Sequence, residues 1–505
     1  MRRCLFLWSA LLLLLLPGLS GCLGEPAEDG EALARRHCQG CHRFTPPDRL
    51  DKERWQAGVL PRMAHYLGLR QPPYAQVLSM GEAQQMREAG IFPPAPLLDT
   101  TDWKKIVAYY RREAPDSLVA GAAGAPIRDS LTRYFHVRPV DLGSSGGALT
   151  SLLHWAPEQA LLYVGDGRNQ LFRVDGHGAV VDVYPLDSPP VAVQPAADGG
   201  AYLLTVGFIR PNNRPRGRLY YLTPQGALQP LLDGLPRPVD MAWADLDGDG
   251  RQDVVICGFG HFTGRLAWYR NRGDHRFEER MLLPQPGALK TYVRDLDGDG
   301  RLDILTLMAQ GDERIVAHYN RGDGRFEAET LLRFEPVFGS SYFEPLDYDG
   351  DLDLLYVNGD NADYSMILKP YHGIRLYENR AGGFEEAFFL PLPGAYKAAV
   401  LDFDGDGDRD IAAISFFPDF EQQPSSGFVL FENSAAAPGS ERFQRRRFDG
   451  ADRGRWLTLE AADLNRDERP DLVLGSFIYS PAPTPAELRR RWQDERTNLL
   501  ILYGR

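Results

Sequence analysis

The chain has 505 residues, which is too many for one ordinary hydrophobic core unless a repeat architecture carries much of the sequence. A hydrophobic content of 43% and a charged content of 25% are typical of globular proteins and argue against a disordered chain. The formal net charge of -13 argues against nucleic acid as a partner, because phosphate binding needs clustered Lys and Arg.

Residues 1–21 have the features of an export signal. Two arginines precede an apolar run that is too short to span a membrane comfortably, and small residues follow it. The sequence LSGC at 19–22 resembles the bacterial lipobox, in which the cysteine is lipidated and becomes the first residue. The resemblance implies a lipoprotein anchored at Cys22, and Leu23 after it favours the outer membrane. A plain signal peptide and a transmembrane anchor are the alternatives.

Cys38, Cys41 and His42 form a C-x-x-C-H motif at the end of a predicted helix. Two thiols three positions apart lie on one helical face and can form thioethers to the two vinyl groups of haem, while the adjacent imidazole binds the iron. A zinc ribbon would need a fourth ligand, and a redox disulfide is expected in a βαβ setting. The motif therefore predicts one covalent haem c, with zinc and a redox disulfide as alternatives.

Residues 22–117 resemble a small class I cytochrome c domain. Its closing segment has a helix-start signal at Thr101–Asp102, one apolar stripe and a proline stop at Pro115. A W…V…M stretch resembles that of compact cytochromes, which implies Met63 as the distal iron ligand. The other candidates for this ligand are Met80, Met86 and His65.

Five loops carry side-chain oxygens at repeated spacings, beginning at Asp245, Asp295, Asp347, Asp402 and Asp463. Such spacing forms an oxygen cage for a hard cation, and the packed carboxylates would repel without one, so we expect about three to five structural calcium ions. An EF-hand is excluded because β-rich runs, not helices, follow the loops. The predicted ligands are Asp245, Asp247, Asp249, Asp253, Asp295, Asp297, Asp299, Asp303, Asp347, Asp349, Asp353, Asp402, Asp404, Asp406, Asp410, Asp463, Asn465, Asp467 and Asp471.

Two of these loops are weaker candidates than the other three. The loop at Asp347 is two residues shorter, and the loop at Asp463 has Asn465 and replaces the turn glycine with Glu468. We therefore expect the loops at Asp245, Asp295 and Asp402 to be the complete calcium sites.

The spacing of the loops predicts the architecture. Their first aspartates lie roughly 50 to 60 residues apart, which is the length of a propeller blade. A second motif recurs in phase, as in YRNRGDHRF and YNRGDGRF, and predicts an outer hairpin. Both motifs resemble FG-GAP/VCBS repeats, the calcium-loop blades also found in integrin α-subunits, most specifically over 240–475.

The predicted fold is therefore mainly β, a seven-bladed β-propeller over 137–505 preceded by a small all-α cytochrome c domain and a linker at 118–136. Two degenerate blades come before the five that carry the loops. The last segment, TNLLILYGR, is expected to supply a strand that closes the ring. A capped helix is expected to begin at Thr484, shortly before that strand.

The connection 358–379 is longer and more polar than a blade hairpin needs. It predicts a ligand site at the propeller mouth, where such folds bind ligands, or else an ordered structural insertion. The candidate residues are Asp360, Asp363, Tyr364, Lys369, Tyr371 and His372.

The whole pattern resembles cytochrome c/VCBS-repeat fusion proteins of envelope-bearing bacteria. The resemblance implies a lipid-anchored electron-transfer protein of the outer membrane, facing the periplasm or the surface, whose partner is a redox protein or a small electron donor or acceptor. A haem-linked oxidoreductase with a substrate pocket on the propeller is one alternative, and a surface adhesion module with accessory haem is another. No nucleophile–base signature is visible, so no catalytic residue is assigned and enzymatic activity stays open.

Overall fold

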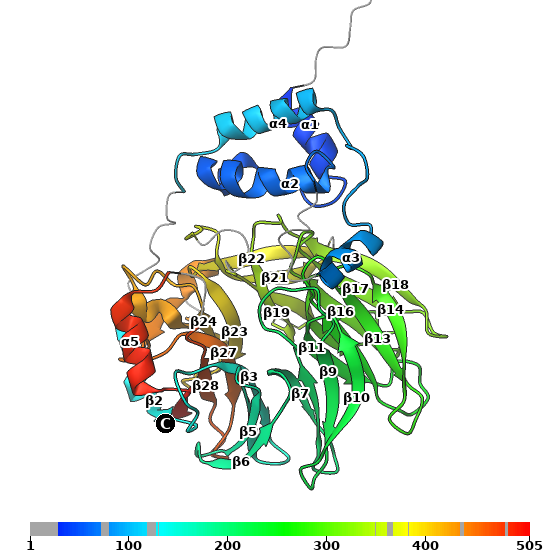
Figure 1. Ribbon diagram of the computed structural model, residues 1–505. Coiled ribbons are helices and arrows are strands. Elements are labelled where there is room, and N and C mark those ends of the chain that lie inside the picture. Colours follow the sequence, from blue (N-terminus) through cyan, green and yellow to red (C-terminus); the bar gives the residue numbers. More distant parts are fainter. Residues whose placement is uncertain are drawn as a thin grey trace, which may run out of the picture.

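The computed structural model has a group of helices above a β-propeller (Figure 1). The structure describes residues 29–71, 80–118, 128–129, 131–348, 350–360, 367–381, 383–434, 439–479 and 483–505. The predicted signal peptide and Cys22 lie outside these residues, as do Asp349, Asp363 and Tyr364. None of the helices in the described part of the chain is long and apolar enough to cross a membrane.

Helices dominate the described residues before 118. They are α1 (Gly30–Cys38), η1 (Pro47–Arg49), η2 (Arg54–Val59), α2 (Leu60–Tyr66), α3 (Met80–Glu88) and α4 (Thr100–Glu113). Helix α4 begins at Thr100 rather than at the predicted Thr101–Asp102, because the side chain of Asp99 accepts hydrogen bonds from the next turn and caps the helix. The helix ends before Pro115, as predicted.

Helices α1 and α4 cross closely and bury one apolar core with η2 and α2. A Cβ on Gly30 would lie 2.4 Å from the carbonyl oxygen of Lys105, so this crossing requires glycine. Leu33, Trp55 and Ile106 belong to the core, and the half-buried Cys38 packs against it. The helical domain therefore fixes the end of α1, where the C-x-x-C-H motif begins.

The described strands form seven sheets, as the sequence predicted. Each sheet is one blade, and its strands run in order from the propeller axis outward. The blades are, first, β3 (Thr150–Ala156), β4 (Leu161–Asp166), β5 (Gln170–Asp175) and β6 (Val180–Pro185); second, β7 (Pro190–Pro195), β8 (Ala201–Thr205), β9 (Gly217–Leu222) and β10 (Leu228–Leu235); third, β11 (Pro238–Ala244), β12 (Asp253–Gly258), β13 (Arg265–Asn271) and β14 (Phe277–Leu283); fourth, β15 (Ala288–Arg294), β16 (Asp303–Met308), β17 (Arg314–Asn320) and β18 (Phe326–Arg333); fifth, β19 (Ser340–Asp347), β20 (Leu352–Asn358), β21 (Gly373–Arg380) and β22 (Gly383–Pro391); sixth, β23 (Ala395–Leu401), β24 (Asp410–Ser415), β25 (Phe428–Glu432) and β26 (Gln444–Arg447); seventh, β27 (Trp456–Ala462), β28 (Asp471–Ser476), β29 (Leu499–Gly504) and β2 (Phe135–Val140).

The seventh blade closes the ring with strands from both ends of the propeller. Strand β29, from the predicted closing segment, pairs with β28 on one side and with β2 on the other. Apolar side chains fill the space between neighbouring blades, as Trp268 of the third blade and Ile304 of the fourth do. Closure therefore leaves every blade packed on both faces.

Two predicted boundaries were wrong. Part of the expected linker 118–136 belongs to the propeller, because β1 (Arg128–Asp129) pairs with β26 and Leu131 is fully buried in the core. Helix α5 (Ala486–Glu495) begins after Pro485 and has no side-chain cap. Thr484 does not cap it, and its hydroxyl accepts a hydrogen bond from the guanidinium of Arg455 instead.

Candidate functional site

The C-x-x-C-H motif forms one tight turn after α1. The backbone N–H groups of Cys41 and His42 both donate to the carbonyl of Cys38, at 3.2 and 3.3 Å. Neither cysteine is in a disulfide. The Nδ1 atom of His42 lies 2.7 Å from the carbonyl oxygen of Arg43. In the neutral tautomer with the proton on Nδ1, this contact leaves the Nε2 lone pair available, which is how metal-binding histidines are usually oriented.

Burial favours the uncharged forms of Cys38 and His42. It raises the pKa of the Cys38 thiol to about 11, and the neighbouring Cys41 adds to the shift. The pKa of His42 is lowered, mainly by burial and also by Arg333, although the Arg43 carbonyl and Asp312 act in the opposite direction. A neutral imidazole is the form that binds a metal, so the donor set fits a haem iron.

The candidates for the distal ligand lie in two different places. Met63 and His65 are on α2, which shares its core with Cys38. The Nδ1 atom of His65 is buried and has no hydrogen-bond partner among the described residues. Met86 is buried on α3, which lies against the propeller apart from α1, α2 and α4 (Figure 1). This position favours α2 as the source of the ligand; the side chain of Met80 lies outside the described residues.

Contacts with the propeller hold α3 in that position. A carboxylate oxygen of Glu82 accepts a hydrogen bond from the backbone N–H of Asn213 at 2.8 Å, and Arg214 lies 3.7 Å from the other oxygen. Phe92, after α3, packs against Phe262 with ring centroids 5.9 Å apart.

The predicted ligand site at 358–379 is largely buried. Lys369, Tyr371 and His372 expose 4%, 8% and 1% of their surface. The hydroxyl of Tyr371 donates to the carbonyl of Arg49 at 3.0 Å, so the helical domain covers this part of the loop. The ligand site at 358–379 stays a prediction, and the burial of these three side chains suits the alternative of an ordered structural insertion.

Lys369 lies beside a buried carboxylate that the sequence analysis missed. Glu313 accepts hydrogen bonds from the backbone N–H groups of Ser340 and Gly339, at 2.7 and 3.2 Å. Burial raises its pKa to about 7 and lowers the pKa of Lys369 to about 8, while each charge partly offsets the shift of the other. No local sequence signal marks Glu313, because the residues around it come from two blades.

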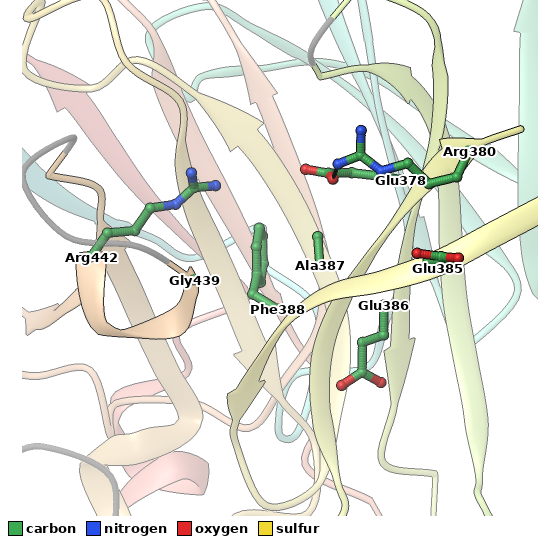
Figure 2. Close-up of a pocket in the computed structure, with 8 residues that line it drawn as sticks. All are labelled: Glu378, Arg380, Glu385, Glu386, Ala387, Phe388, Gly439 and Arg442. Atoms are coloured by element: carbon green, nitrogen blue, oxygen red, sulfur yellow. Dashed lines mark hydrogen bonds and ion pairs between the residues drawn. The ribbon is translucent and has the colours of Figure 1, made fainter.

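A surface pocket of about 310 Å³ lies where β22 faces the 3₁₀ turn η6 (Gly439–Arg442), as Figure 2 shows. Its arginines are engaged by neighbouring groups: Arg380 pairs with Glu378, and Arg442 donates to the hydroxyl of Tyr348. None of the predicted site residues lines it, and we assign it no function. The lining residues are Glu378, Arg380, Glu385, Glu386, Ala387, Phe388, Gly439 and Arg442.

Three of the aspartate loops gather carboxylates in the way a cation site requires. In the first, the carboxylate of Asp245 accepts hydrogen bonds from the N–H groups of Gly248 and Gly250, both at 2.8 Å, which folds the loop around it. The other two loops repeat these contacts. The groups whose oxygens lie within 4.8 Å of one another are Asp245, Asp247 and Asp253; Asp295, Asp297 and Asp299; and Asp402, Asp404 and Asp410.

Arginines compensate the negative charge in two of these loops. Arg270 pairs with Asp247 in the first loop, and Arg321 pairs with Asp297 in the second at 2.8 Å. The second loop also contains an ion pair between Arg301 and Asp299.

The loop at Asp402 differs from these two loops in its charges. It carries a further acid, Asp408, where the other two have arginine, and its Arg409 instead donates to the carbonyl of Asp347. One buried oxygen of Asp404 and one of Asp408 lack a hydrogen-bond partner among the described residues. Burial, and then the charge of Asp406, raise the pKa of both carboxyls. This loop therefore fits a bound cation best.

The last aspartate of every loop has a structural role that the sequence analysis did not predict. Asp253 begins β12, and its two oxygens accept the N–H groups of Leu246 in its own loop, at 3.3 Å, and of Asn271 at the end of β13, at 2.7 Å. Equivalent pairs of contacts occur in the other four loops. These five buried aspartates are Asp253, Asp303, Asp353, Asp410 and Asp471.

The loop at Asp463 keeps the turn without its glycines. Asp463 accepts hydrogen bonds from the N–H groups of Asp467 and Glu468, at 3.1 and 2.9 Å. Arg466 and Glu468 occupy the glycine positions and adopt φ of 64° and 67°. Among the described residues, this loop forms no group of three metal-capable carboxylates, so Asn465 and its neighbours remain weaker candidates.

A comparison with protein families supports the repeat. The family model for the FG-GAP-like repeat matches residues 245–306, 295–356 and 346–413. A comparison with curated proteins gave no match. Among solved structures, the chain is similar to BBS1N in complex with ARL6DN (11% identity, TM-score 0.44), covering 74% of this chain and 96% of that one.

Two further structures are similar at the same level. The Pan2 WD40 domain of Neurospora crassa has 10% identity and a TM-score of 0.45, covering 75% of this chain and 97% of its own. The structure of U3-55K has 10% identity and a TM-score of 0.46, covering 73% and 98%. With the seven sheets described above, the repeat match leads to one conclusion: the chain carries FG-GAP-like repeats within a seven-bladed β-propeller.

Proposed function

We propose that the chain is a c-type cytochrome that transfers single electrons through one covalent haem, and that its propeller is a calcium-stabilised platform for docking a redox partner. The observation that carries the proposal is the turn after α1, which brings Cys38, Cys41 and His42 together. There the Nδ1 of His42 is engaged by a backbone carbonyl and its Nε2 is left available.

Each residue of the segment has a distinct role in this proposal. Cys38 and Cys41 hold the haem through thioethers, His42 is the proximal ligand, and Met63 is the distal ligand with His65 as the alternative. The haem supplies reversible one-electron chemistry at its iron. A lipid on Cys22 anchors the protein at the outer membrane, in a compartment where haem can be attached.

The propeller side of the proposal rests on the aspartate loops. The three groups of close carboxylates support calcium binding at Asp245, Asp295 and Asp402, and the buried oxygens of the third that lack hydrogen-bond partners among the described residues support it most strongly. The burial of Lys369, Tyr371 and His372 gives no support to a substrate pocket at that loop, so we prefer electron transfer over the oxidoreductase alternative.

Covalent attachment can be tested directly. We expect the full chain, exported in a host that matures c-type cytochromes, to retain haem staining on a denaturing gel. The double variant Cys38→Ser/Cys41→Ser should lose it, because both thioethers are gone. The matched control Cys257→Ala should keep it, since this buried thiol lies on β12 of the propeller. An unstained full chain, or a stained double variant, would contradict the proposal.

The distal ligand has its own signature. A thioether bound to ferric haem gives a weak long-wavelength absorption band, which Met63→Ala should abolish. Met86→Ala serves as the control and should retain the band, because α3 lies against the propeller. If His65 were the ligand, the full chain would lack the band and His65→Ala would change the spectrum instead.

A further inference from the structure

The outer strand of the fourth blade ends against the turn that carries the cysteines. The guanidinium of Arg333, the last residue of β18, donates to the carbonyl of Cys41 at 3.3 Å. In return, Arg43 donates from Nη1 to the carbonyl of Arg333 at 2.8 Å. These contacts join residues some 290 positions apart in the sequence, so the propeller contacts both neighbours of His42, through the backbone of Cys41 and the side chain of Arg43.

A second set of contacts holds the segment a few residues further on. Arg49 lies 3.6 Å from a carboxylate oxygen of Glu335, which is buried, and its carbonyl accepts the hydroxyl of Tyr371. Val337 and Ile367 of the propeller pack against the core of the helical domain. The stretch from Cys41 to Arg49 is therefore fixed at both ends by propeller residues.

Opposite charges of the propeller lie beside the segment that carries His42. The Nε of Arg333 donates to a carboxylate oxygen of Asp312 at 2.6 Å, and Arg314 pairs with the other oxygen. Arg333 contacts the carbonyl of Cys41, the residue before His42, and Asp312 pairs with Arg333, so both charges lie close to the segment that carries the imidazole.

We infer that Arg333 and Asp312 are positioning residues for the segment bearing Cys41 and His42, and that their charges set the reduction potential of the haem. The inference rests on the proposed function. It makes the propeller part of the redox centre, because one blade contacts both neighbours of the proximal ligand and places the charges of Arg333 and Asp312 beside them.

The two residues are expected to shift the potential in opposite directions. A positive charge near the iron favours the ferrous state, so Arg333→Gln should lower the ferrous-to-ferric ratio at a fixed ambient potential, by about three- to tenfold. Asp312→Asn should raise that ratio by a similar factor. A tenfold change corresponds to a midpoint shift of about 59 mV for one electron. Redox titration of each variant of the full chain, monitored through the haem absorption, measures both midpoint shifts.

A matched pair at the other end of the same strand provides the control. Arg325 and Asp323 form an exposed ion pair 3.4 Å apart in the turn before β18. The eight residues of β18 separate this turn from Arg333 by roughly 25 Å. Arg325→Gln and Asp323→Asn change the charge equally, and we expect both to leave the midpoint unchanged.

The outcomes separate this inference from the proposed function. A full chain without covalent haem contradicts the proposed function itself. If haem is present, equal midpoints in the Arg333 and Asp312 variants and their controls overturn the inference alone, as does a shift of the same sign in both variants. Arg333→Lys keeps the charge and should keep the midpoint. If Arg333→Gln fails to fold, Asp312→Asn and Arg333→Lys still decide the question.

Discussion

A buried aspartate lies at the start of the second strand in five blades. It shows how one residue can both stabilise the fold and belong to a predicted calcium loop. In the seventh blade, Asp471 accepts the N–H of Leu464 in its own loop and that of Gly504 at the end of β29. It thereby links the loop, the strand that follows it and the closing strand. This blade forms no group of three carboxylates among the described residues, so the structural role can be measured there without the metal.

We expect Asp471→Ala to lower the free energy of unfolding by about 2–3 kcal/mol, because two buried N–H groups lose their acceptor. The loss should persist in a chelator. Urea denaturation followed by circular dichroism measures it. Asp467→Ala removes an exposed carboxylate from the same loop and should change stability by less than about 0.5 kcal/mol, and equal effects of the two substitutions would refute the structural role.

At the scale of the element, the loops differ in how they neutralise their own charge. Arg270 and Arg321 pair with aspartates of the first two complete loops, whereas in the loop at Asp402 one buried oxygen each of Asp404 and Asp408 has no hydrogen-bond partner among the described residues. Coulombic repulsion among these acids destabilises the loop unless protons or a cation bind. We therefore expect its folding to depend on calcium more than that of the other two.

Calcium at a hundredfold excess over its dissociation constant should stabilise the chain by about 2.7 kcal/mol for each site. With calcium present, Asp404→Asn should remove one site and its share of the stabilisation. In a chelator, the same substitution should raise the stability, because repulsion among the carboxylates of the loop falls. Calorimetric titration counts the sites, and thermal unfolding with and without calcium measures the stability. Asp274→Asn, in an exposed hairpin turn, is the control. An unchanged melting temperature after chelation of the unmutated chain would contradict occupied loops.

At the scale of the whole molecule, the aspartate loops and the contact with the helical domain lie at opposite edges of a blade. In the fourth blade, Ala288, Met308, Arg314 and Arg333 lie in register at the edge that meets the helical domain. The loop at Asp295 lies at the opposite edge, because it follows the end of β15. The aspartate loop therefore lies at one face of the ring, while the other face contacts the C-x-x-C-H segment.

Ring closure should make the stability of the propeller depend on its last strand. Leu500 of β29 is fully buried between the blades, and we expect Leu500→Ala to cost about 2–5 kcal/mol in the free energy of unfolding. Urea denaturation measures the loss as a shift of the transition. Leu97→Ala removes the same atoms from an exposed side chain, so a comparable loss there would contradict the expectation.

The repeats were readable from the sequence because their interactions are local. The aspartate loops and the asparagine turns, such as the one after Asn271, fold through hydrogen bonds within a few residues, so their spacing predicted seven blades correctly. The pairing of β1 with β26 was missed, because a two-residue strand far from its partner leaves no periodic signal. The burial of Lys369 was also missed, because this part of the loop is covered by a helical domain that is distant in the sequence.

By itself the sequence determined the repeat, the blade number and the residues of the C-x-x-C-H motif, since each follows from short-range spacing and side-chain chemistry. Only the tertiary structure decided that Arg333 meets Cys41, that the helical domain covers Tyr371, and that one buried oxygen of Asp408 has no hydrogen-bond partner among the described residues. Those contacts join segments up to about 320 residues apart, and their partners are chosen by how the closed ring packs rather than by any local pattern.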